Sequence, residues 1–344
     1  MTPPPPPATP RRRRLLAGAA AGLAAAAVPA RRAAAHAPPA APAARWQMAT
    51  PYAEGSYHTR NIRGFAEDLA AATGGRVAVH VHTNGSLLPM PQIKRGVQQA
   101  QVQLGEILLS AYANEDPFFD VDAIPQLVAS FAEARRLHDL SRPYVEARFA
   151  RQGLVLLYMV PWPPAGFYSN APLASIEAFR GMKMRTFNTM TQRFAQLVGA
   201  TPTLVQLAEV AQAFATGVVN TMVTSAAGGV DTAAWDYARV FTPVGFSMTK
   251  TAILANRRAV EALSPADGEA LRRAAAAAEA RGYALAEEAT AATEARLAER
   301  GMRIERATPE LLRGLGEVSR TMTEEWIGRA GEDGRRLIEA YRAS

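Results

Sequence analysis

The feature that most constrains the fold is an uninterrupted segment near the C-terminus, residues 265–300. Ser264 can cap a helix at its start, Pro265 fits a first helical turn, and no further proline occurs before Gly301. These 36 residues predict one helix about 54 Å long at 1.5 Å per residue, longer than one small domain is wide. Because its alanine-rich middle lacks the large residues of a coiled-coil seam, we expect the helix to run across two lobes.

The preceding part of the chain alternates short strand-like runs with longer helix-like runs, which predicts an α/β fold. Residues 76–82 show the alternation of a strand most clearly, with Val77, Val79 and Val81 on one face. Further strands are expected at residues 46–50, 106–110, 155–160, 167–170, 183–186, 203–206, 218–224 and 251–255. This order predicts largely parallel sheets, whose ligands bind beyond the carboxyl ends of the strands. After the long helix, a capped helix is expected from Thr308, and a third helix ends the chain.

The N-terminal residues have the three parts of a secretory signal. A basic run at residues 11–14 precedes an apolar segment at 15–28, and small residues follow at 33–35. Because the apolar segment has 14 residues, it is too short to cross a bilayer, which takes about 20. We therefore expect a signal peptide over residues 1–37, a flexible tether over 38–45, and a periplasmic location. The paired arginines also fit a twin-arginine signal, so the general secretory and twin-arginine routes both stay open.

Composition limits the partners of the chain. The net charge of +7 and the pI near 10 are typical of a protein that binds nucleic acid. Six arginines lie in residues 1–37, however, and removing that stretch leaves a net charge of +1, so we expect no nucleic-acid partner. The 344 residues contain no cysteine, which excludes disulfides and thiol chemistry, and their number favours two lobes over one.

Several short motifs occur in a fixed order along the chain. They are Thr-Gly-Gly-Arg-Val at 73–77, Asn-Gly-Ser-Leu at 84–87, Arg-Gly-Met-Lys-Met-Arg at 180–185, Gly-Ala-Thr-Pro at 199–202, Glu209, and Val-Val-Asn at 218–220. Together they resemble the receptors of tripartite ATP-independent periplasmic (TRAP) transporters, and the resemblance covers nearly all of the chain after the leader. It implies a two-lobed periplasmic-binding-protein fold, similar to type II. We expect one lobe from residues 46–162 with 247–282, and the other from 163–246 with 283–344.

The resemblance also implies that Arg185 holds the carboxylate of a ligand. The planar guanidinium can form two charge-assisted hydrogen bonds to a carboxylate and fix its orientation, which a lysine does less well. The alternative is that Arg185 belongs to an ordinary surface or structural ion pair.

The sequence departs from the family pattern at neighbouring positions. Thr224 stands where an asparagine commonly contacts ligand, Val223 replaces an acidic residue, Tyr168 replaces a second arginine, and Leu207 replaces an aromatic residue. Losing the second arginine and the acidic residue favours a ligand with one carboxylate and no bridging metal.

Four further residues are candidates for the ligand site. Trp162, Tyr112 and Tyr52 follow predicted strands, where ligands bind in such folds, although they could instead pack the hinge or core. Asn188 could contact ligand or cap the following helix. Gly282, in the middle of the long helix, could be a hinge or could relieve close packing.

Metal binding and catalysis have little support. His80 and His82 share one strand face and could ligate a metal, but no third ligand is close in sequence, so we expect no metal and no cofactor. The chain has no Gly-x-Ser-x-Gly motif and no zinc motif, so we expect no enzyme.

The function predicted from these features is capture of a small organic acid for a TRAP transporter. We expect a monocarboxylate with an apolar or aromatic remainder, a monomeric receptor, and the membrane subunits of the transporter as partners. The alternatives are a receptor for an ABC importer or a sensor, and an exported hydrolase or lyase acting on a carboxylic acid.

Overall fold

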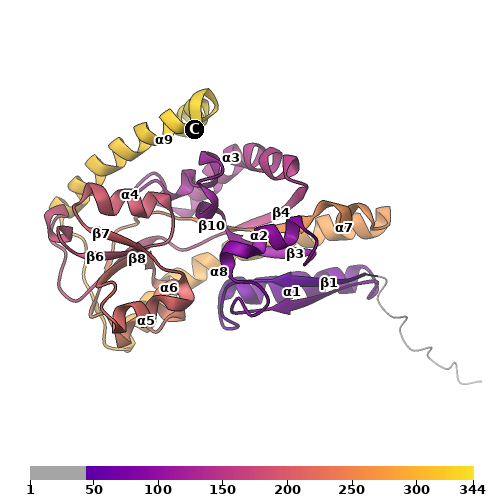
Figure 1. The fold of residues 1–344 in the computed structure, drawn as a ribbon, viewed down its shortest axis with the longest axis horizontal. Helices are drawn as coiled ribbons and strands as arrows, with labels where there is room; N and C mark the ends of the chain where they lie inside the picture. The colour runs from indigo at the N-terminus through magenta and orange to yellow at the C-terminus, as the bar shows by residue number, and fades with distance from the viewer. Residues whose placement is uncertain (1–43) are drawn as a thin grey trace, which may run out of the picture. The chain divides into compact units, whose positions relative to one another are not determined.

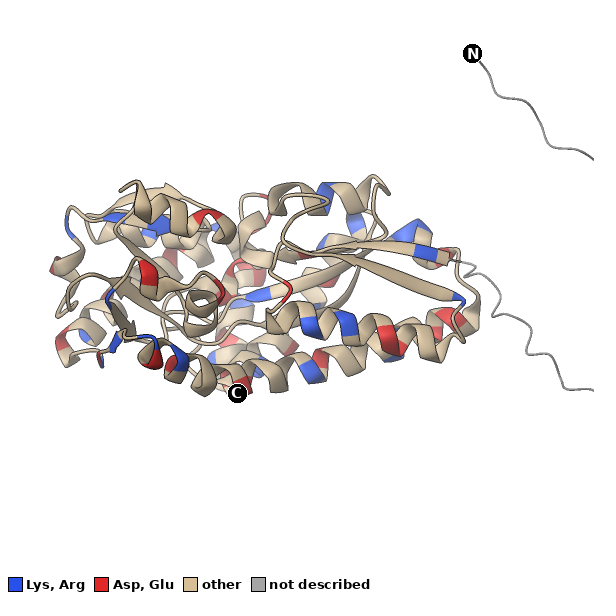
Figure 2. Ribbon diagram, turned by 90° about the horizontal axis from the view of Figure 1, so that it is seen from below, with Lys and Arg blue, Asp and Glu red and all other residues tan. Residues whose placement is uncertain are grey.

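The computed structural model describes residues 44–344 (Figure 1). The expected signal peptide and most of the expected tether lie outside the described residues. The first strand begins at Ala44, so the last two residues assigned to the tether belong to a strand instead. Basic and acidic residues are interspersed over the ribbon (Figure 2), in line with the net charge of +1 that remains without the leader.

The first sheet has five strands in the order β2-β1-β3-β10-β4. They are β1 (Ala44–Ala49), β2 (Val77–His82), β3 (Leu104–Leu108), β4 (Leu154–Pro161) and β10 (Lys250–Asn256). The helices of this part are α1 (Tyr57–Ala72), α2 (Met90–Gln98), α3 (Phe131–Arg151) and α7 (Arg257–Glu261), with short 3₁₀ helices η1 (Leu109–Tyr112), η2 (Pro117–Phe119) and η3 (Val121–Ala123). β10 is buried along its whole length, as expected for a strand with neighbours on both sides.

The second sheet has six strands in the order β11-β9-β5-β8-β6-β7. They are β5 (Ala165–Ser169), β6 (Lys183–Thr186), β7 (Thr201–Leu204), β8 (Thr221–Ser225), β9 (Val240–Pro243) and β11 (Arg303–Ile304). Its helices are α4 (Thr189–Leu197), α5 (Val210–Ala215) and α6 (Ala226–Asp231), with 3₁₀ helices η4 (Ile176–Phe179), η5 (Leu207–Glu209) and η6 (Ala234–Asp236). The two-sheet α/β architecture confirms the predicted fold class.

The expectation of largely parallel sheets is wrong, because both sheets are mixed. β10 runs antiparallel to β3 and β4, and β5 runs antiparallel to β8 and β9. The chain enters both strands directly from the other sheet, through residues 162–164 and 244–249. No crossover helix precedes either strand to return it to the parallel direction. The short strands β9 and β11 were not predicted, since four and two residues are too few to show a period of two.

The two connections between the sheets lie side by side. Trp162 N donates to Thr249 O at 2.7 Å, Ala165 N donates to Ser247 O at 3.0 Å, and Phe246 N donates to Ala165 O at 2.8 Å. A two-stranded link therefore joins the sheets.

The long helix is α8 (Pro265–Glu299), 35 residues capped by Ser264, whose hydroxyl accepts from Asp267 N at 3.1 Å. It packs on α1 and β4 of the first sheet and on α6 and β11 of the second, which confirms the predicted helix spanning both parts. Gly282 is buried, and a Cβ there would lie 2.5 Å from Val160 Cγ2. The structure thus favours close packing over a hinge at Gly282.

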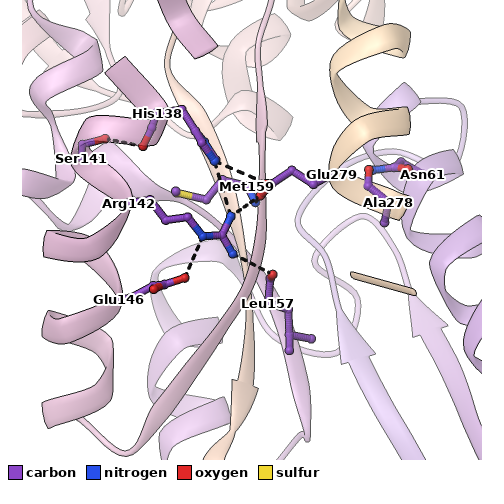
Figure 3. A network of polar contacts seen from close by, with 9 residues as sticks. All are labelled: Asn61, His138, Ser141, Arg142, Glu146, Leu157, Met159, Ala278 and Glu279. Atoms are coloured by element: carbon purple, nitrogen blue, oxygen red, sulfur yellow. Dashed lines mark hydrogen bonds and ion pairs between the residues drawn. The ribbon is translucent and has the colours of Figure 1, made fainter. Parts of the chain in front are cut away.

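A polar cluster anchors α8 to the first sheet (Figure 3). Glu279 Oε2 accepts from Arg142 Nη1 at 2.6 Å and from Met159 N at 2.9 Å. Asn61 Nδ2 on α1 donates to Ala278 O at 2.9 Å. We call Arg142, Glu279 and His138 the anchor cluster; His138 Nε2 lies 3.4 Å from Glu279 Oε1.

The last helix, α9 (Pro309–Ala343), is capped by Thr308 and broken at Gly331, where φ is 69° and ψ is −151°. The two segments on either side of Gly331 correspond to the two final helices predicted from the sequence. α9 packs on α3 and on α4, and Trp326 Nε1 donates to Pro117 O at 2.7 Å. Within residues 44–344, no helix combines the length and apolar character needed to cross a membrane.

The strands of the two sheets fall within the two predicted lobes. Residues 44–344 nevertheless lie in one compact unit, because α8, α9 and the two connections all contact both parts. The division into 46–162 with 247–282 and 163–246 with 283–344 stays a prediction.

Candidate functional site

A pocket lies beside the two-stranded link, between the two sheets. The space between its walls is about 450 Å³, open solvent included. The lining residues come from both sheets and from the link: Tyr52, Leu108, Trp162, Pro163, Ala165, Arg185, Phe187, Leu207, Thr224, Ser225, Ser247 and Thr249. Five of the eight predicted site residues are in this set.

Arg185 supplies the positive charge of the pocket. It lies near the carboxyl end of β6, where strand alternation turns its neighbour Met184 into the core. The Arg185 side chain is 3% exposed; its Nε donates to Val205 O at 2.9 Å, and its guanidinium lies 4.9 Å from the centre of the Phe187 ring. No carboxylate within residues 44–344 forms an ion pair with it.

This environment is chemically suited to an anion beside Arg185. Burial lowers the pKa of Arg185 to about 10, so the side chain is still charged at neutral pH. A buried charge without a partner is costly, and a bound anion would offset that cost. One nitrogen of the guanidinium is held by the backbone, which orients the remaining N–H groups before a ligand arrives.

Four hydroxyl groups complement the charge. Thr224 and Ser225 come from β8, while Ser247 and Thr249 come from the second connection. Ser225 Oγ accepts from Gly228 N at 3.1 Å, which leaves its own hydrogen free to donate. The sequence reading found Thr224 and missed the other three. Ser225 was not predicted, because its sequence context indicates only the N-cap of a helix, the role it has at α6. Nothing in the local sequence places residues 247 and 249 in the pocket.

Aromatic and apolar side chains form the walls of the pocket. The rings of Tyr52 and Trp162 meet edge to face with centroids 5.1 Å apart. Leu108, Phe187 and Leu207 add apolar surface. Tyr52, Trp162 and Leu207 were predicted for the site, and the structure brings them together with Arg185.

Three predicted site residues lie outside the lining. Tyr168 is fully buried, and its hydroxyl donates to Ser225 O at 3.1 Å. Tyr112 is also buried, and its hydroxyl donates to Met90 O at 2.9 Å. Asn188 itself caps α4, since its Oδ1 accepts from Thr191 N at 2.8 Å, and its Nδ2 donates to Ser110 Oγ at 2.9 Å. The structure therefore gives all three a packing or capping role, and direct contact with a ligand stays a prediction for them.

The pocket continues towards solvent in two directions past Tyr52 and Leu207. One branch passes Asn84, Met90, Gln206 and Glu209, and the other passes Asp231 and Thr232. Burial raises the pKa of Asp231 to about 6. Glu209 and Asp231 thus lie on different branches, and Arg185 also lines the branch with Glu209. Of the described residues that line the main pocket, none is acidic.

The histidine pair on β2 lies outside this pocket. The rings of His80 and His82 are 4.5 Å apart, and His82 Nε2 lies 2.6 Å from Gln47 Oε1. In the described part of the chain, no three His, Cys, Asp or Glu side chains gather in a way that could hold a metal ion.

Comparison with known proteins identifies the family of the chain. Residues 48–328 match the model of DctP, the bacterial extracellular solute-binding protein family 7. The chain belongs to the DctP family. Its fold is that of an extracytoplasmic solute receptor.

Two similar solved structures support the assignment. DctP7, an extracytoplasmic solute receptor of Bordetella pertussis that binds pyroglutamic acid, is 41% identical with a TM-score of 0.85, covering 87% of this chain and 99% of that one. A TRAP solute-binding protein from a marine metagenome, specific for pyroglutamate, is 32% identical with a TM-score of 0.85, covering 87% of this chain and 99% of that one. This DctP-family chain is therefore a receptor of the TRAP type.

A shorter match is found with a curated relative. The uncharacterized protein YiiZ of Salmonella typhimurium is 27% identical over 178 residues, which are 49% of this chain and 53% of YiiZ. The chain thus aligns with about half the length of that relative. The DctP family consists of solute-binding receptors, not enzymes.

Proposed function

We propose that the chain is a periplasmic receptor that captures a small monocarboxylate with a compact, uncharged remainder, of the pyroglutamate type, and delivers it to the membrane subunits of a TRAP transporter. The observation that carries this proposal is Arg185, a buried guanidinium with no carboxylate partner within residues 44–344. An N-terminal signal would export the chain.

The charges of the pocket select the ligand class. Among the twelve lining residues, all within the described range, Arg185 is the one with a permanent charge. One carboxylate satisfies it, while a second carboxylate would be buried without a cation and an ammonium group without an anion. A neutral remainder avoids both penalties, so the pocket favours a lactam acid over an open-chain amino acid.

The hydroxyl groups suit the remainder of such a ligand. A lactam ring carries one N–H donor and one carbonyl acceptor, and Thr224, Ser225, Ser247 and Thr249 can accept or donate. Tyr52 and Trp162 would cover the apolar face of the ring. The pyroglutamate that two relatives bind has this combination of groups, which supports it as the ligand of this chain.

Closure of the lobes explains how binding is signalled to the transporter. Tyr52 and Leu108 lie on the first sheet's side, Arg185 and Thr224 on the second's, so a ligand touching both favours the closed form. The two-stranded link at residues 162–165 and 246–249 is the natural hinge, because it is the shortest covalent path between the sheets.

Isothermal titration of the purified receptor with L-pyroglutamate tests the proposal. We expect saturable binding of one ligand per chain, and at least tenfold weaker binding of L-glutamate and L-proline, since each leaves a buried charge unpaired. Arg185→Lys keeps the charge and loses the fork, and it should weaken binding by about 10- to 100-fold. Arg180→Lys, an exposed change on the same lobe, is the matched control.

Two results would contradict the proposal. The first is wild-type affinity for pyroglutamate in the Arg185→Lys and Arg185→Ala variants. The second is conversion of the ligand during long incubation, followed by NMR, which would indicate an enzyme instead of a receptor.

A further inference from the structure

A buried polar layer lies directly behind the floor of the pocket. We define the polar layer as Thr50, His58, Glu106 and Thr251, all nearly inaccessible to solvent. Three of its members stand two residues from a lining residue: Thr50 from Tyr52, Glu106 from Leu108, and Thr251 from Thr249. Residues i and i+2 of a strand point to the same face about 6.6 to 6.8 Å apart. Glu106 therefore lies on the same face of β3 as the lining residue Leu108, two residues before it.

Glu106 has few partners for an ionised carboxylate. It is 0% exposed, and its Oε2 accepts one hydrogen bond, from Thr50 Oγ1 at 2.5 Å. Its Oε1 faces His58 Nδ1 at 3.5 Å and has no hydrogen-bond partner within residues 44–344. A buried carboxylate needs several donors to stay charged, so this environment favours the protonated form.

His58 is in no position to supply a compensating positive charge. Its ring is fully buried against Tyr57, Trp162 and Tyr52, with centroids 4.1, 4.3 and 5.3 Å away. Its Nδ1 lies 3.3 Å from Thr251 Oγ1, and its Nε2 has no hydrogen-bond partner in the described part of the chain. Burial lowers the pKa of His58 well below its ordinary value and raises the pKa of Glu106 to about 7. The imidazole thus stays neutral while Glu106 titrates near neutral pH.

We propose that Glu106 controls ligand affinity through its own ionisation, with the protonated form favouring and the ionised form opposing an anion at Arg185. The inference rests on the proposed function, because it requires an anionic ligand in the pocket. As the pH rises through 7, Glu106 loses its proton and places a negative charge behind the floor. That charge competes with the ligand for Arg185, so affinity falls. By linkage, ligand binding raises the pKa of Glu106 and takes up protons.

The other ionisable groups that face Glu106 can be separated from it. Around Glu106 these are His58 and Tyr57 on α1, Tyr52 after β1 and Tyr158 on β4. Arg185 and Asp231 lie further across the pocket, where both act on Tyr52. Burial raises the pKa of each of the three tyrosines well above 10, so they stay neutral between pH 5.5 and 8.5. Arg185, with a pKa of about 10, stays charged. Asp231 is the rival, because its pKa of about 6 lies inside the window.

Titration calorimetry with L-pyroglutamate from pH 5.5 to 8.5 tests the role of Glu106. The wild type should lose about three- to tenfold in affinity from pH 6 to pH 8, tenfold being the limit for one proton lost from a group with a pKa of about 7. Glu106→Gln mimics the protonated form and should keep high affinity with a flat pH profile. Asp231→Asn should retain the wild-type loss. A pH-dependent Glu106→Gln variant, or a flat Asp231→Asn variant, would overturn the proposal.

A second measurement needs no variant of Glu106, in case Glu106→Gln does not fold. Calorimetry of the wild type at pH 7 in buffers of different ionisation enthalpy gives the protons taken up on binding. We expect about 0.3 to 0.5 of a proton, in the wild type and in Asp231→Asn alike. Zero uptake contradicts the proposal. A pH-independent affinity for pyroglutamate contradicts the role of Glu106 alone, whereas no binding at any pH contradicts the proposed function as well.

Discussion

Two arginines in this receptor lie in opposite chemical settings. Arg142, in the anchor cluster, donates to Glu279 Oε2 at 2.6 Å, Glu146 Oε1 at 2.7 Å and Leu157 O at 3.2 Å (Figure 3). Arg185, in the pocket, donates one hydrogen bond, to Val205 O. Both guanidinium groups are partly or fully withdrawn from water. The anchor arginine therefore uses its donors within the fold, whereas the pocket arginine has one hydrogen bond within residues 44–344.

The pKa shifts of the two side chains differ in the same way. Burial works against the charge of Arg142, but Glu279 and Glu146 outweigh it and raise its pKa. Burial lowers the pKa of Arg185 to about 10, because no carboxylate in the described part of the chain pairs with it. Burial alone therefore does not distinguish the two arginines. They differ in the number of donors that find partners within the fold. Substitution of Arg185 should therefore change ligand affinity without lowering stability, and substitution of Arg142 should lower stability without changing affinity.

The largest expected effect is on binding. Arg185→Ala should reduce affinity for L-pyroglutamate by about 100- to 1,000-fold, because two charge-assisted hydrogen bonds are lost. The free energy of unfolding of the ligand-free protein should stay the same or rise, since an unpaired buried charge is removed. Calorimetry and urea unfolding measure the two quantities. A marked loss of stability in Arg185→Ala would show that this arginine is structural.

The reverse result is expected in the anchor cluster. Arg142→Ala should lower the free energy of unfolding by about 3 kcal/mol, because the partly buried Glu279 loses the ion pair and the 2.6 Å hydrogen bond that Arg142 supplies. Ligand affinity should stay within about twofold, measured by calorimetry well below the unfolding temperature. Arg272→Ala, which removes an exposed pair with Glu269, is the control and should change stability by less than about 0.5 kcal/mol. Equal effects of the two substitutions would contradict the comparison.

We expect acid to weaken the anchor cluster, whereas Arg185 stays protonated at low pH. Burial favours a raised pKa for Glu279, but His138, the Met159 amide and Arg142 outweigh it and lower the pKa to about 2. A carboxylate with a lowered pKa stabilises the fold above its ordinary pKa of 4.5, and this stabilisation is lost as the pH falls from 4.5 towards 2. The loss should be on the order of 2 to 3 kcal/mol. Urea unfolding at pH 6 and pH 3 measures it, and Glu279→Gln should be less stable at pH 6 and show a flatter profile.

The smallest expected effect concerns the packing of α8 on the first sheet. Gly282→Ala should destabilise the protein by about 1 to 2 kcal/mol, because the new Cβ would lie 2.5 Å from Val160 Cγ2. At Gly268, in the same helix, a new Cβ would lie 3.9 Å from Nη1 of the flexible Arg272 side chain, so Gly268→Ala should stabilise the protein by about 0.5 to 1 kcal/mol. Thermal unfolding of the two variants compares them. Equal changes in both would argue that Gly282 is a flexible point and not a packing position.

Much of the fold could be predicted from local patterns. The cap at Ser264 and the absence of proline predicted α8 to within one residue at its end, and strand alternation placed Arg185 on β6. The order of short motifs then indicated the family and the role of this arginine. These features are legible because capping and side-chain alternation depend on a few neighbouring residues.

The sequence alone therefore determined most of the helices and strands of this receptor and singled out Arg185 as the charged residue of the site. Only the tertiary structure decided which other residues line the pocket. Ser247 and Thr249 line the pocket because the second connection pairs with the first across about 85 residues of chain, and no local period records that pairing. Tyr168 and Asn188 have packing and capping roles that depend on β8 and α4. Glu106 reads as an ordinary strand residue until β1, β10 and α1 enclose it. Burial and the shortage of donors, both properties of distant segments brought together, give it a pKa near neutral pH.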